Sequence, residues 1–227
     1  MEGLNLLVID STSSSLKIAI QINNKVNIFE QTQKQMNHLE CLLPLIDKGI
    51  AEIGENKKAL NVACVCHGPG SFTGIRVGIA TVLGIAFAGN FESFGFSSFD
   101  VYDYLFAGRS DAVIIPIVDA KKKRFYTTFL HNDDLSYYDL SAADIIEKVK
   151  DIKKEIIFVG SDFSMMEEQV RNAGIKYTFE YQQGFSSEQM LEAVKFLIQN
   201  KKMTSPEPIY LRKSEAEIAL EEKLAKS

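Results

Sequence analysis

The sequence predicts an α/β protein of two similar lobes, each a mixed β-sheet with flanking helices. The first half reads strand, strand, strand, helix, strand, helix, and a comparable order begins again near residue 112. The chain has 227 residues, of which 46% are hydrophobic, and this is enough to bury two small cores. We expect the first lobe at residues 1–105 and the second at 106–227, whose C-terminal tail can pack back on the first.

The first half opens with a three-stranded meander, since apolar runs are joined by Asn23-Asn24, a pair typical of tight turns. A helix follows, because Leu42 and Ile46 recur at helical spacing on one apolar face. The short apolar run VACVC and a long apolar helix complete this half. The predicted elements are strands at 6–10, 16–22, 25–30 and 62–66, and helices at 38–52 and 71–89.

The second half repeats this order after a junction near residues 103–111. Ser141 is placed to cap one helix, and Ser186 or Ser187 to begin another. The basic run Lys121–Lys123 with Arg124 has two interpretations, a solvated hairpin turn or a contact for tRNA phosphates. The predicted strands are 112–118, 124–130 and 155–159, the helices are 141–150, 164–173, 187–200 and 215–224, and residues 206–211 are extended.

The segment GPGSFTGIRVGIATVLGIAFA at residues 68–88 is the most informative stretch. It is no P-loop, because Ile75 rather than lysine follows Gly74, and its glycines are spaced one residue too far apart for a dinucleotide fingerprint. Pro69 and Gly70 favour a tight turn, and Ser71 favours a helix cap. An anion bound at the amides of residues 71–73 remains an alternative.

The helix after this loop is apolar on nearly every side, so nearly every side should be buried. Glycine inside a helix costs about 1 kcal/mol relative to alanine, so Gly74 and Gly78 need a packing reason. Either a partner covers the side that does not meet the chain's own sheet, or its own chain covers both. The uncharged run 77–91 is shorter than the roughly 20 residues that cross a bilayer, so we expect no membrane span.

Composition points to a cytoplasmic protein. The net charge of −5 does not indicate an autonomous RNA-binding surface. The first ten residues lack the features of a signal peptide, and the three cysteines form no C-x-x-C pair, so reduced, buried thiols are expected.

Five segments, in order along the chain, resemble the TsaB (YeaZ) family. They are LLVIDSTSSSLKIAI at 6–20, HLECLLPLI at 38–46, GPGSFTGIRVG at 68–78, VDAKKKRFY at 118–126 and PEPIYLRKSEA at 206–216. The sequence departs from the family pattern at three places: His67 before the glycine loop, the serine-rich run after Asp10 and the cluster of basic residues after Asp119.

The resemblance implies a two-lobed actin-like ATPase fold (ASKHA, RNase H-like) and a noncatalytic role. TsaB proteins pair with the catalytic subunit TsaD through helices of the first lobe, and the ATPase TsaE joins that pair. The assembly transfers threonylcarbamoyl to N6 of adenosine 37 in tRNAs that read ANN codons. The partners implied are therefore a TsaD-like subunit, a TsaE-like ATPase, a second copy when the protein is alone, and tRNA only through the complex.

The sequence lacks most of the residues with which related enzymes bind nucleotide and metal. The loops that would hold nucleotide phosphates, after Asp10 and Asp119, lack glycine, and the candidate adenosine loop retains only Gly160. Residues 96–102, which match the metal-binding stretch of TsaD, contain no histidine, and His67 is interpreted as a loop residue. We expect no catalytic residue, cofactor or metal. Alternatives are an ATP-hydrolysing or sugar-kinase-like enzyme of this fold, and a homodimeric interaction module outside tRNA modification.

The first-lobe helices are expected to form a helix–helix interface with the partner, because they carry more apolar surface than one small sheet needs. Arg76 at its rim is suited to a carboxylate or a backbone carbonyl. The candidate interface residues are Ser71, Phe72, Gly74, Arg76, Val77, Gly78, Leu42 and Ile46.

Overall fold

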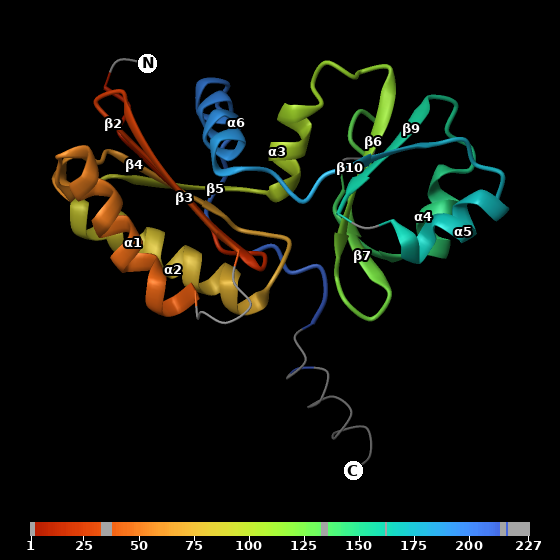
Figure 1. Cartoon of the computed structure of the whole chain (residues 1–227), viewed down its shortest axis with the longest axis horizontal. Coiled ribbons are helices and arrows are strands. Elements are labelled where there is room, and N and C mark those ends of the chain that lie inside the picture. The colour runs from red at the N-terminus through yellow and green to blue at the C-terminus, as the bar shows by residue number, and fades with distance from the viewer. Residues whose placement is uncertain (1–2, 33–37, 133–135, 162, 214–216, 218–227) are drawn as a thin grey trace, which may run out of the picture.

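Two five-stranded sheets form the two halves of the computed structural model, which describes residues 3–32, 38–132, 136–161, 163–213 and 217 (Figure 1). In the first sheet the strand order is β3-β2-β1-β4-β5, with the first three strands antiparallel and β4 and β5 parallel to β1. The strands are β1 (Leu6–Asp10), β2 (Ser15–Ile22), β3 (Lys25–Thr32), β4 (Val62–Cys66) and β5 (Glu92–Phe96).

Helices cover both faces of this sheet. Because side chains alternate along a strand, Leu7 and Ile9 of β1 pack with α1 (His38–Ile53) and α2 (Phe72–Gly89) on the outer face. Leu6 and Val8 point to the inner face, where α3 (Ser98–Leu105) and α6 (Ser187–Gln199) lie. Figure 1 shows the two pairs of helices on opposite sides of the sheet.

The second sheet repeats the pairing of the first, with the order β10-β9-β6-β7-β8. Its strands are β6 (Ala112–Asp119), β7 (Arg124–Thr127), β8 (Tyr138–Ser141), β9 (Glu155–Gly160) and β10 (Thr178–Tyr181). The helices α4 (Ala142–Val149) and α5 (Ser164–Asn172) complete the lobe, and Lys57–Ala59 form a short 3-10 helix in the first. This duplication confirms the predicted architecture of two similar α/β lobes with mixed sheets.

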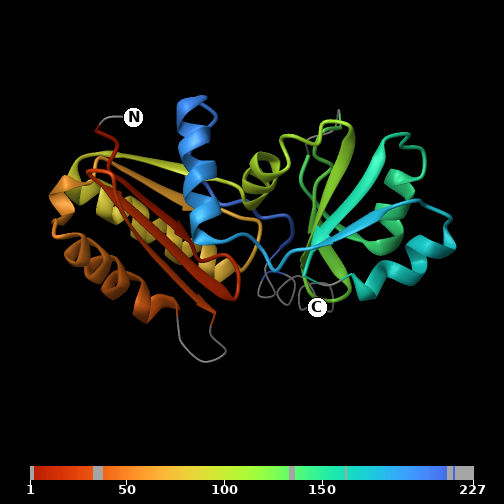
Figure 2. The ribbon, with the colours of Figure 1, turned by 45° about the horizontal axis from the view of Figure 1, so that its top comes forward.

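A single buried cluster fills the space between the two sheets. It joins Val8 of the first sheet and Ile114 of the second through Phe99 and Tyr102 of α3 and Met190 of α6. Figure 2 shows α6 lying against the first sheet, with α3 on its side toward the second lobe. The two lobes therefore share one continuous core, built around α3 and α6.

The chain returns to its first half at the C-terminus. The α6 helix contacts β1, β2 and β3, although it follows the second lobe in sequence. After it, residues 204–212, which we call the strap, run along the first lobe: Thr204 bridges Gly95, and the Ile209 amide donates to the carbonyl of His67 (2.9 Å). A boundary at 105/106 thus separates α6 from the sheet on which it packs. The helix expected at 215–224 lies, apart from residue 217, outside the described residues.

Candidate functional site

The N-terminal end of α2 is locked to the loop that follows β1. Ser71 caps the helix as predicted, its hydroxyl accepting from the Gly74 amide (3.3 Å). The Ser71 amide donates to the carbonyl of Thr12 (2.7 Å), and the Ser11 hydroxyl donates to the carbonyl of Gly74 (2.8 Å). One of the three amides considered for anion binding is therefore taken by the chain itself.

Gly74 and Gly78 of α2 make room for this loop of the same chain. A Cβ atom at Gly74 would lie 1.9 Å from the Ser11 carbonyl oxygen, and one at Gly78 would lie 2.6 Å from the Ser11 hydroxyl. Both glycines are buried. Their role is intramolecular, because only a residue without a side chain lets the loop approach this closely.

Two further candidate interface residues also belong to the chain's own core. Leu42 and Ile46 of α1 are buried against the outer face of the first sheet, with exposed fractions of 1% and 0%. Helical periodicity identified an apolar face correctly, but that face is turned toward the sheet. These side chains are therefore not available to a partner in this structure.

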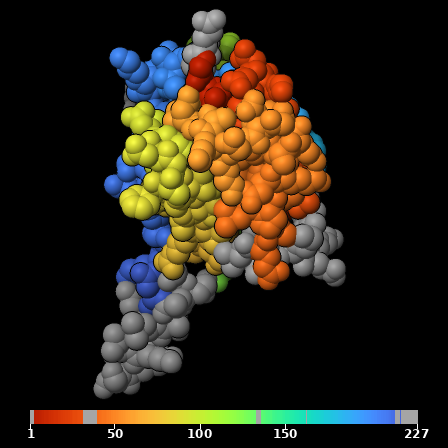
Figure 3. Space-filling view, turned by 90° about the vertical axis from the view of Figure 1, so that its left-hand side faces the viewer, coloured from red at the N-terminus to blue at the C-terminus, as the bar shows by residue number. Residues whose placement is uncertain are grey.

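The other side of α2 carries an exposed apolar stripe. Ala80, Leu83, Gly84 and Phe87 follow one another at intervals of three or four residues, which places them on one helix face. Leu83 is 44% exposed and Phe87 is 91% exposed. We call these four residues the α2 stripe. Figure 3 shows α1 and α2 side by side at this end of the molecule, and Leu43 of α1 is also exposed.

The first turns of α2 hold the remaining candidate interface residues. Ser71 and Arg76 are exposed, and Phe72 and Val77 are half-buried. The ring of Phe72 stacks on that of Tyr210 from the strap, with centroids 4.6 Å apart, and the Arg76 Nε donates to the Tyr210 hydroxyl (2.8 Å). The structure thus brings together two predicted residues and one that sequence analysis did not select.

A buried ion pair lies at the base of the region between the lobes. Lys17 Nζ lies 3.6 Å from Asp10 Oδ2, with both side chains at most 5% exposed, and the same ammonium lies 5.0 Å from the centre of the Phe185 ring. The other carboxylate oxygen of Asp10 accepts from the amide and the hydroxyl of Thr12. Burial, followed by the charge of Asp10, raises the pKa of the nearby Cys66 thiol, which favours a neutral thiol.

The other two loops of the expected nucleotide site have different surroundings. Lys121, Lys122 and Lys123 form the exposed turn between β6 and β7, each with a positive φ, and the Asp119 carboxylate accepts from the Lys121 amide (2.7 Å). Gly160 packs closely on β6, since a Cβ there would lie 2.7 Å from the Ile117 carbonyl oxygen. Its lack of a side chain serves sheet packing.

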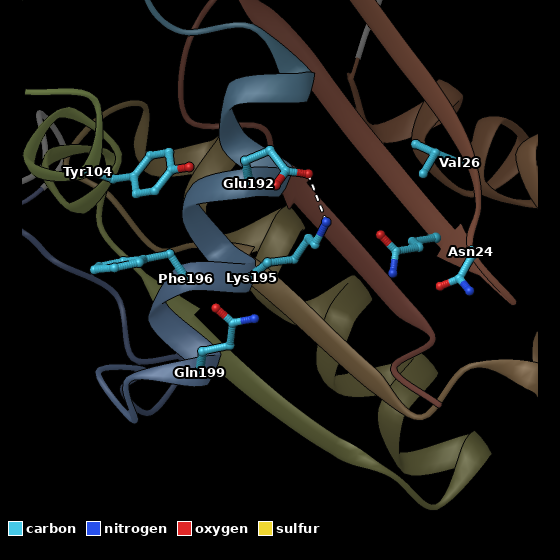
Figure 4. Close-up of a pocket in the computed structure, with 8 residues that line it drawn as sticks. Asn24, Val26, Tyr104, Glu192, Lys195, Phe196 and Gln199 are labelled. Carbon is cyan, nitrogen blue, oxygen red and sulfur yellow. Dashed lines mark hydrogen bonds and ion pairs between the residues drawn. The ribbon is translucent and has the colours of Figure 1, made fainter. Parts of the chain in front are cut away.

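A hollow of about 480 Å³ lies beside α6, away from α2 (Figure 4). Its two charged lining residues bond to each other, with Lys195 Nζ 2.8 Å from Glu192 Oε1. Tyr104 and Phe196 pack on one side, and the side chains of Asn24 and Val26 line the other. The hollow therefore offers aromatic and amide groups beside an already paired charge.

The described residues also bear on metal and membrane contacts. Within the described ranges, no group of three or more His, Cys, Asp and Glu side chains is placed to hold a metal ion. By length and composition alone, α2 is the one helix of the described chain that is suited to cross a membrane. Its buried residues pack into the core of the first lobe, which is equally typical of a core helix.

The sequence is similar to proteins from several bacteria. The tRNA threonylcarbamoyladenosine biosynthesis protein TsaB of Bacillus subtilis is 26% identical over 176 residues, covering 74% of this chain and 76% of that protein. The protein of the same name from Haemophilus influenzae is 34% identical over 88 residues, covering 38% of this chain and 36% of its own length. Residues 28–220 match the family model of TsaD, tRNA N6-adenosine threonylcarbamoyltransferase. The chain belongs to the TsaD family, as a TsaB-type member.

Solved structures agree on the fold of this TsaB-type chain. YeaZ from Pseudomonas aeruginosa aligns with a TM-score of 0.69 at 19% identity, covering 92% of this chain and 100% of that one. A Pseudomonas aeruginosa protein described as similar to peptidase YEAZ aligns with a TM-score of 0.70 at 18% identity and the same coverage. At these identities the likeness concerns the fold.

Four residues of this TsaB-type surface were not among the predicted interface residues: Leu83, Gly84 and Phe87 of α2, and Tyr210 of the strap. The first three were visible as part of an apolar helix, but periodicity could not tell the outer face from the inner one when both were apolar. Tyr210 lies far from α2 in sequence, so its contact with Phe72 and Arg76 carried no local signal.

Proposed function

We propose that the chain is a noncatalytic scaffold subunit of a tRNA-modifying complex in the cytoplasm. It pairs with a TsaD-like catalytic subunit and a TsaE-like ATPase, and the complex transfers threonylcarbamoyl to N6 of adenosine 37 in tRNAs that read ANN codons. The chain contacts tRNA only through that complex. This proposal combines its TsaB-type family membership with one feature of the surface.

The α2 stripe is the observation that carries the proposal. Full burial of an aromatic side chain such as Phe87 is worth about 2–3 kcal/mol, and this protein leaves that ring in water. The neighbouring Ala80 and Gly84 are small, and nothing lies within 4 Å of a Cβ built at Gly84. A facing helix can therefore approach the backbone while it receives the Phe87 ring.

The interior between the lobes supports a noncatalytic role. Side chains of both lobes pack together in one core, and the Asp10 carboxylate, which would serve a nucleotide in a related enzyme, is engaged by Lys17 and Thr12. A nucleotide that used the Asp10 carboxylate would have to disrupt this buried ion pair. This cost supports a structural use of the fold.

Substitution within the α2 stripe tests the proposal. Phe87→Glu should reduce binding of a purified TsaD-like subunit by at least about tenfold, because a charge replaces an apolar anchor. Met165→Glu, at an exposed apolar side chain of α5, is the matched control and should bind normally. Unchanged binding by Phe87→Glu, measured by biolayer interferometry on protein with an unchanged melting temperature, would refute the docking site.

Two measurements separate the alternative functions. Calorimetry with ATP and ADP on the isolated protein tests an ATPase or kinase-like enzyme, and clear binding with turnover would contradict a noncatalytic role. Depletion of the protein, followed by quantification of threonylcarbamoyladenosine in bulk tRNA, tests the pathway. Unchanged levels would favour a homodimeric module outside tRNA modification.

A further inference from the structure

Arg76 is the one charged residue of α2, a helix that is described along its whole length. It lies near the N-terminal end of the helix, and its side chain is exposed, while the α2 stripe continues toward the C-terminal end. A single positive charge beside an apolar surface favours partners that carry a negative charge at the matching position. A partner that covers this end is favoured when it supplies an opposite charge or leaves the guanidinium hydrated.

The Arg76 side chain is held in place by two aromatic rings. Its guanidinium carbon lies 5.9 Å from the centre of the Phe72 ring and 5.6 Å from that of Tyr210, and those rings stack at an interplanar angle of 15°. The Tyr210 hydroxyl accepts from Nε at 2.8 Å. A guanidinium has five N–H donors in a rigid fork, and this bond engages the one on Nε.

The strap fixes Tyr210 in turn. Upstream of Tyr210, Gly95 and Thr204 exchange two backbone hydrogen bonds (2.8 and 3.2 Å), and the Ile209 amide donates to the His67 carbonyl oxygen. Downstream, the Arg212 guanidinium lies 6.0 Å from the Tyr126 ring of the second lobe. The tyrosine is thus held between attachments to both lobes, so the orientation of Arg76 is preset before any partner arrives.

The electrostatics of this position favour a carboxylate ligand. The hydrogen bond that Arg76 donates to Tyr210 and, less strongly, the negative charge of Glu217 raise the pKa of Arg76. A carboxylate of the same chain therefore already lies within electrostatic range of the guanidinium. Arginine pairs with carboxylates through two parallel hydrogen bonds, which gives direction as well as affinity.

We propose that Arg76 is a carboxylate-binding position of the docking surface and that Tyr210 is its positioning residue. The partner is a helix that covers Leu83 and Phe87 with apolar residues and carries an Asp or Glu opposite Arg76. Arg76 and Phe87 are eleven positions apart, so that acidic residue lies about 16 Å along the helix from the residues that receive Phe87. This inference rests on the proposed function, because it assumes that the catalytic subunit binds the α2 stripe.

The same arrangement distinguishes the catalytic subunit from a second copy of this chain. The α2 sequence contains no acidic residue, so the α2 of a second copy does not supply the carboxylate. A homodimer that paired α2 with α2 would gain the apolar contacts without an ion pair between the two helices. Binding to the acidic partner helix is therefore favoured over self-association.

Affinity for the TsaD-like subunit tests this inference with three variants of the full chain. Arg76→Gln should weaken binding about tenfold, because it removes a charge-assisted hydrogen bond. Tyr210→Phe keeps the ring but removes the hydroxyl, and should weaken binding by a smaller factor, about threefold. The double variant should bind no worse than Arg76→Gln, because the hydroxyl acts through the arginine.

Controls separate positioning from a merely structural role. Arg171→Gln removes the same charge from an exposed position on α5 and should leave affinity unchanged. All variants should melt at the wild-type temperature, and raising the salt concentration should weaken wild-type binding more than that of Arg76→Gln. Replacement of the facing acidic residue of the partner by lysine should restore binding to Arg76→Glu.

The outcomes are distinguishable. If Phe87→Glu abolishes binding while Arg76→Gln and Tyr210→Phe do not change it, the inference is wrong and the docking site stands. If none of the three changes binding, the proposed function fails as well. Loss of binding in Arg76→Gln without any effect of Tyr210→Phe would overturn the positioning role of the tyrosine.

Discussion

The hydroxyl of Ser11 donates a 2.8 Å hydrogen bond to the carbonyl oxygen of Gly74, and the carbonyl oxygen of Ser11 occupies the space that a side chain at position 74 would need. This contact ties the loop after β1 to the first turn of α2. The loop after β1, which the sequence suggested as a phosphate loop, here supports a helix. The glycines of α2 therefore stabilise the first lobe, and the opposite side of the helix remains exposed.

Alanine substitutions of glycines on the two sides of α2 should have opposite effects on stability. Gly74→Ala should lower the free energy of unfolding by about 2–3 kcal/mol, because a Cβ would lie 1.9 Å from a backbone oxygen that cannot easily move. Gly84→Ala is the matched control and should raise it by about 0.5–1 kcal/mol, since that site is open and alanine is the better helix former. Urea unfolding measures both, and equal effects of either sign would contradict the contact.

Self-association of the isolated protein should depend on the α2 stripe. Phe87→Ser should shift the protein toward the monomer and remove any dependence of the melting temperature on protein concentration, because association stabilises by mass action. Sedimentation velocity over a hundredfold range of concentration measures this. Tyr181→Ser, at another exposed aromatic residue, should have no such effect. If Phe87→Ser associates as the wild type does, the protein self-associates through another surface.

The effects on stability of substitutions at Lys17 and Asp10 should be strongly non-additive. Asp10→Asn or Lys17→Met alone should each destabilise the protein by about 3–5 kcal/mol, because each leaves the other charge buried without its counterion. The double variant should recover most of that loss. Chemical denaturation of the four proteins gives the coupling, and simple additivity would exclude it. Any test of nucleotide binding with an Asp10 variant therefore needs a folding control.

Stability should decrease in mildly acidic solution because of His67. Burial lowers the pKa of this imidazole below 6.5, despite opposing contributions from the backbone of Ser205 and Glu207, and its Nδ1 atom has no hydrogen-bond partner among the described residues. The unfolded chain then binds more protons than the folded one, so the contribution is complete above pH 6.5 and is lost as pH falls toward the folded pKa.

The comparison of wild type with His67→Gln isolates this effect. The difference in melting temperature between them should change between about pH 7.5 and pH 5, with the wild type losing more stability on acidification. Carboxylates elsewhere contribute equally to both proteins and cancel in the difference. A constant difference across this range would show that the imidazole titrates alike in the folded and unfolded chains.

Local patterns predicted most of the elements. The strand Val62–Cys66 and the α2 helix with its Ser71 cap lie where expected, because an apolar run and a capping side chain are local signals. The strand β5 was missed because ESFGF mixes polar, small and aromatic residues. The α3 helix was missed even though Ser97 and Asp100 form a capping box, a signal that the sequence contained.

By itself the sequence determined the repeated order of elements, the two-lobed fold and the apolar character of α1 and α2, since each depends on residues close together in the chain. Only the tertiary structure decided which side of α2 is covered, because both sides are apolar and the loop that covers one of them lies sixty residues upstream. It also decided that Tyr210 reaches Arg76, across 134 positions. Contacts between distant segments leave no periodic trace in a sequence, and the proposed partner surface depends on such contacts.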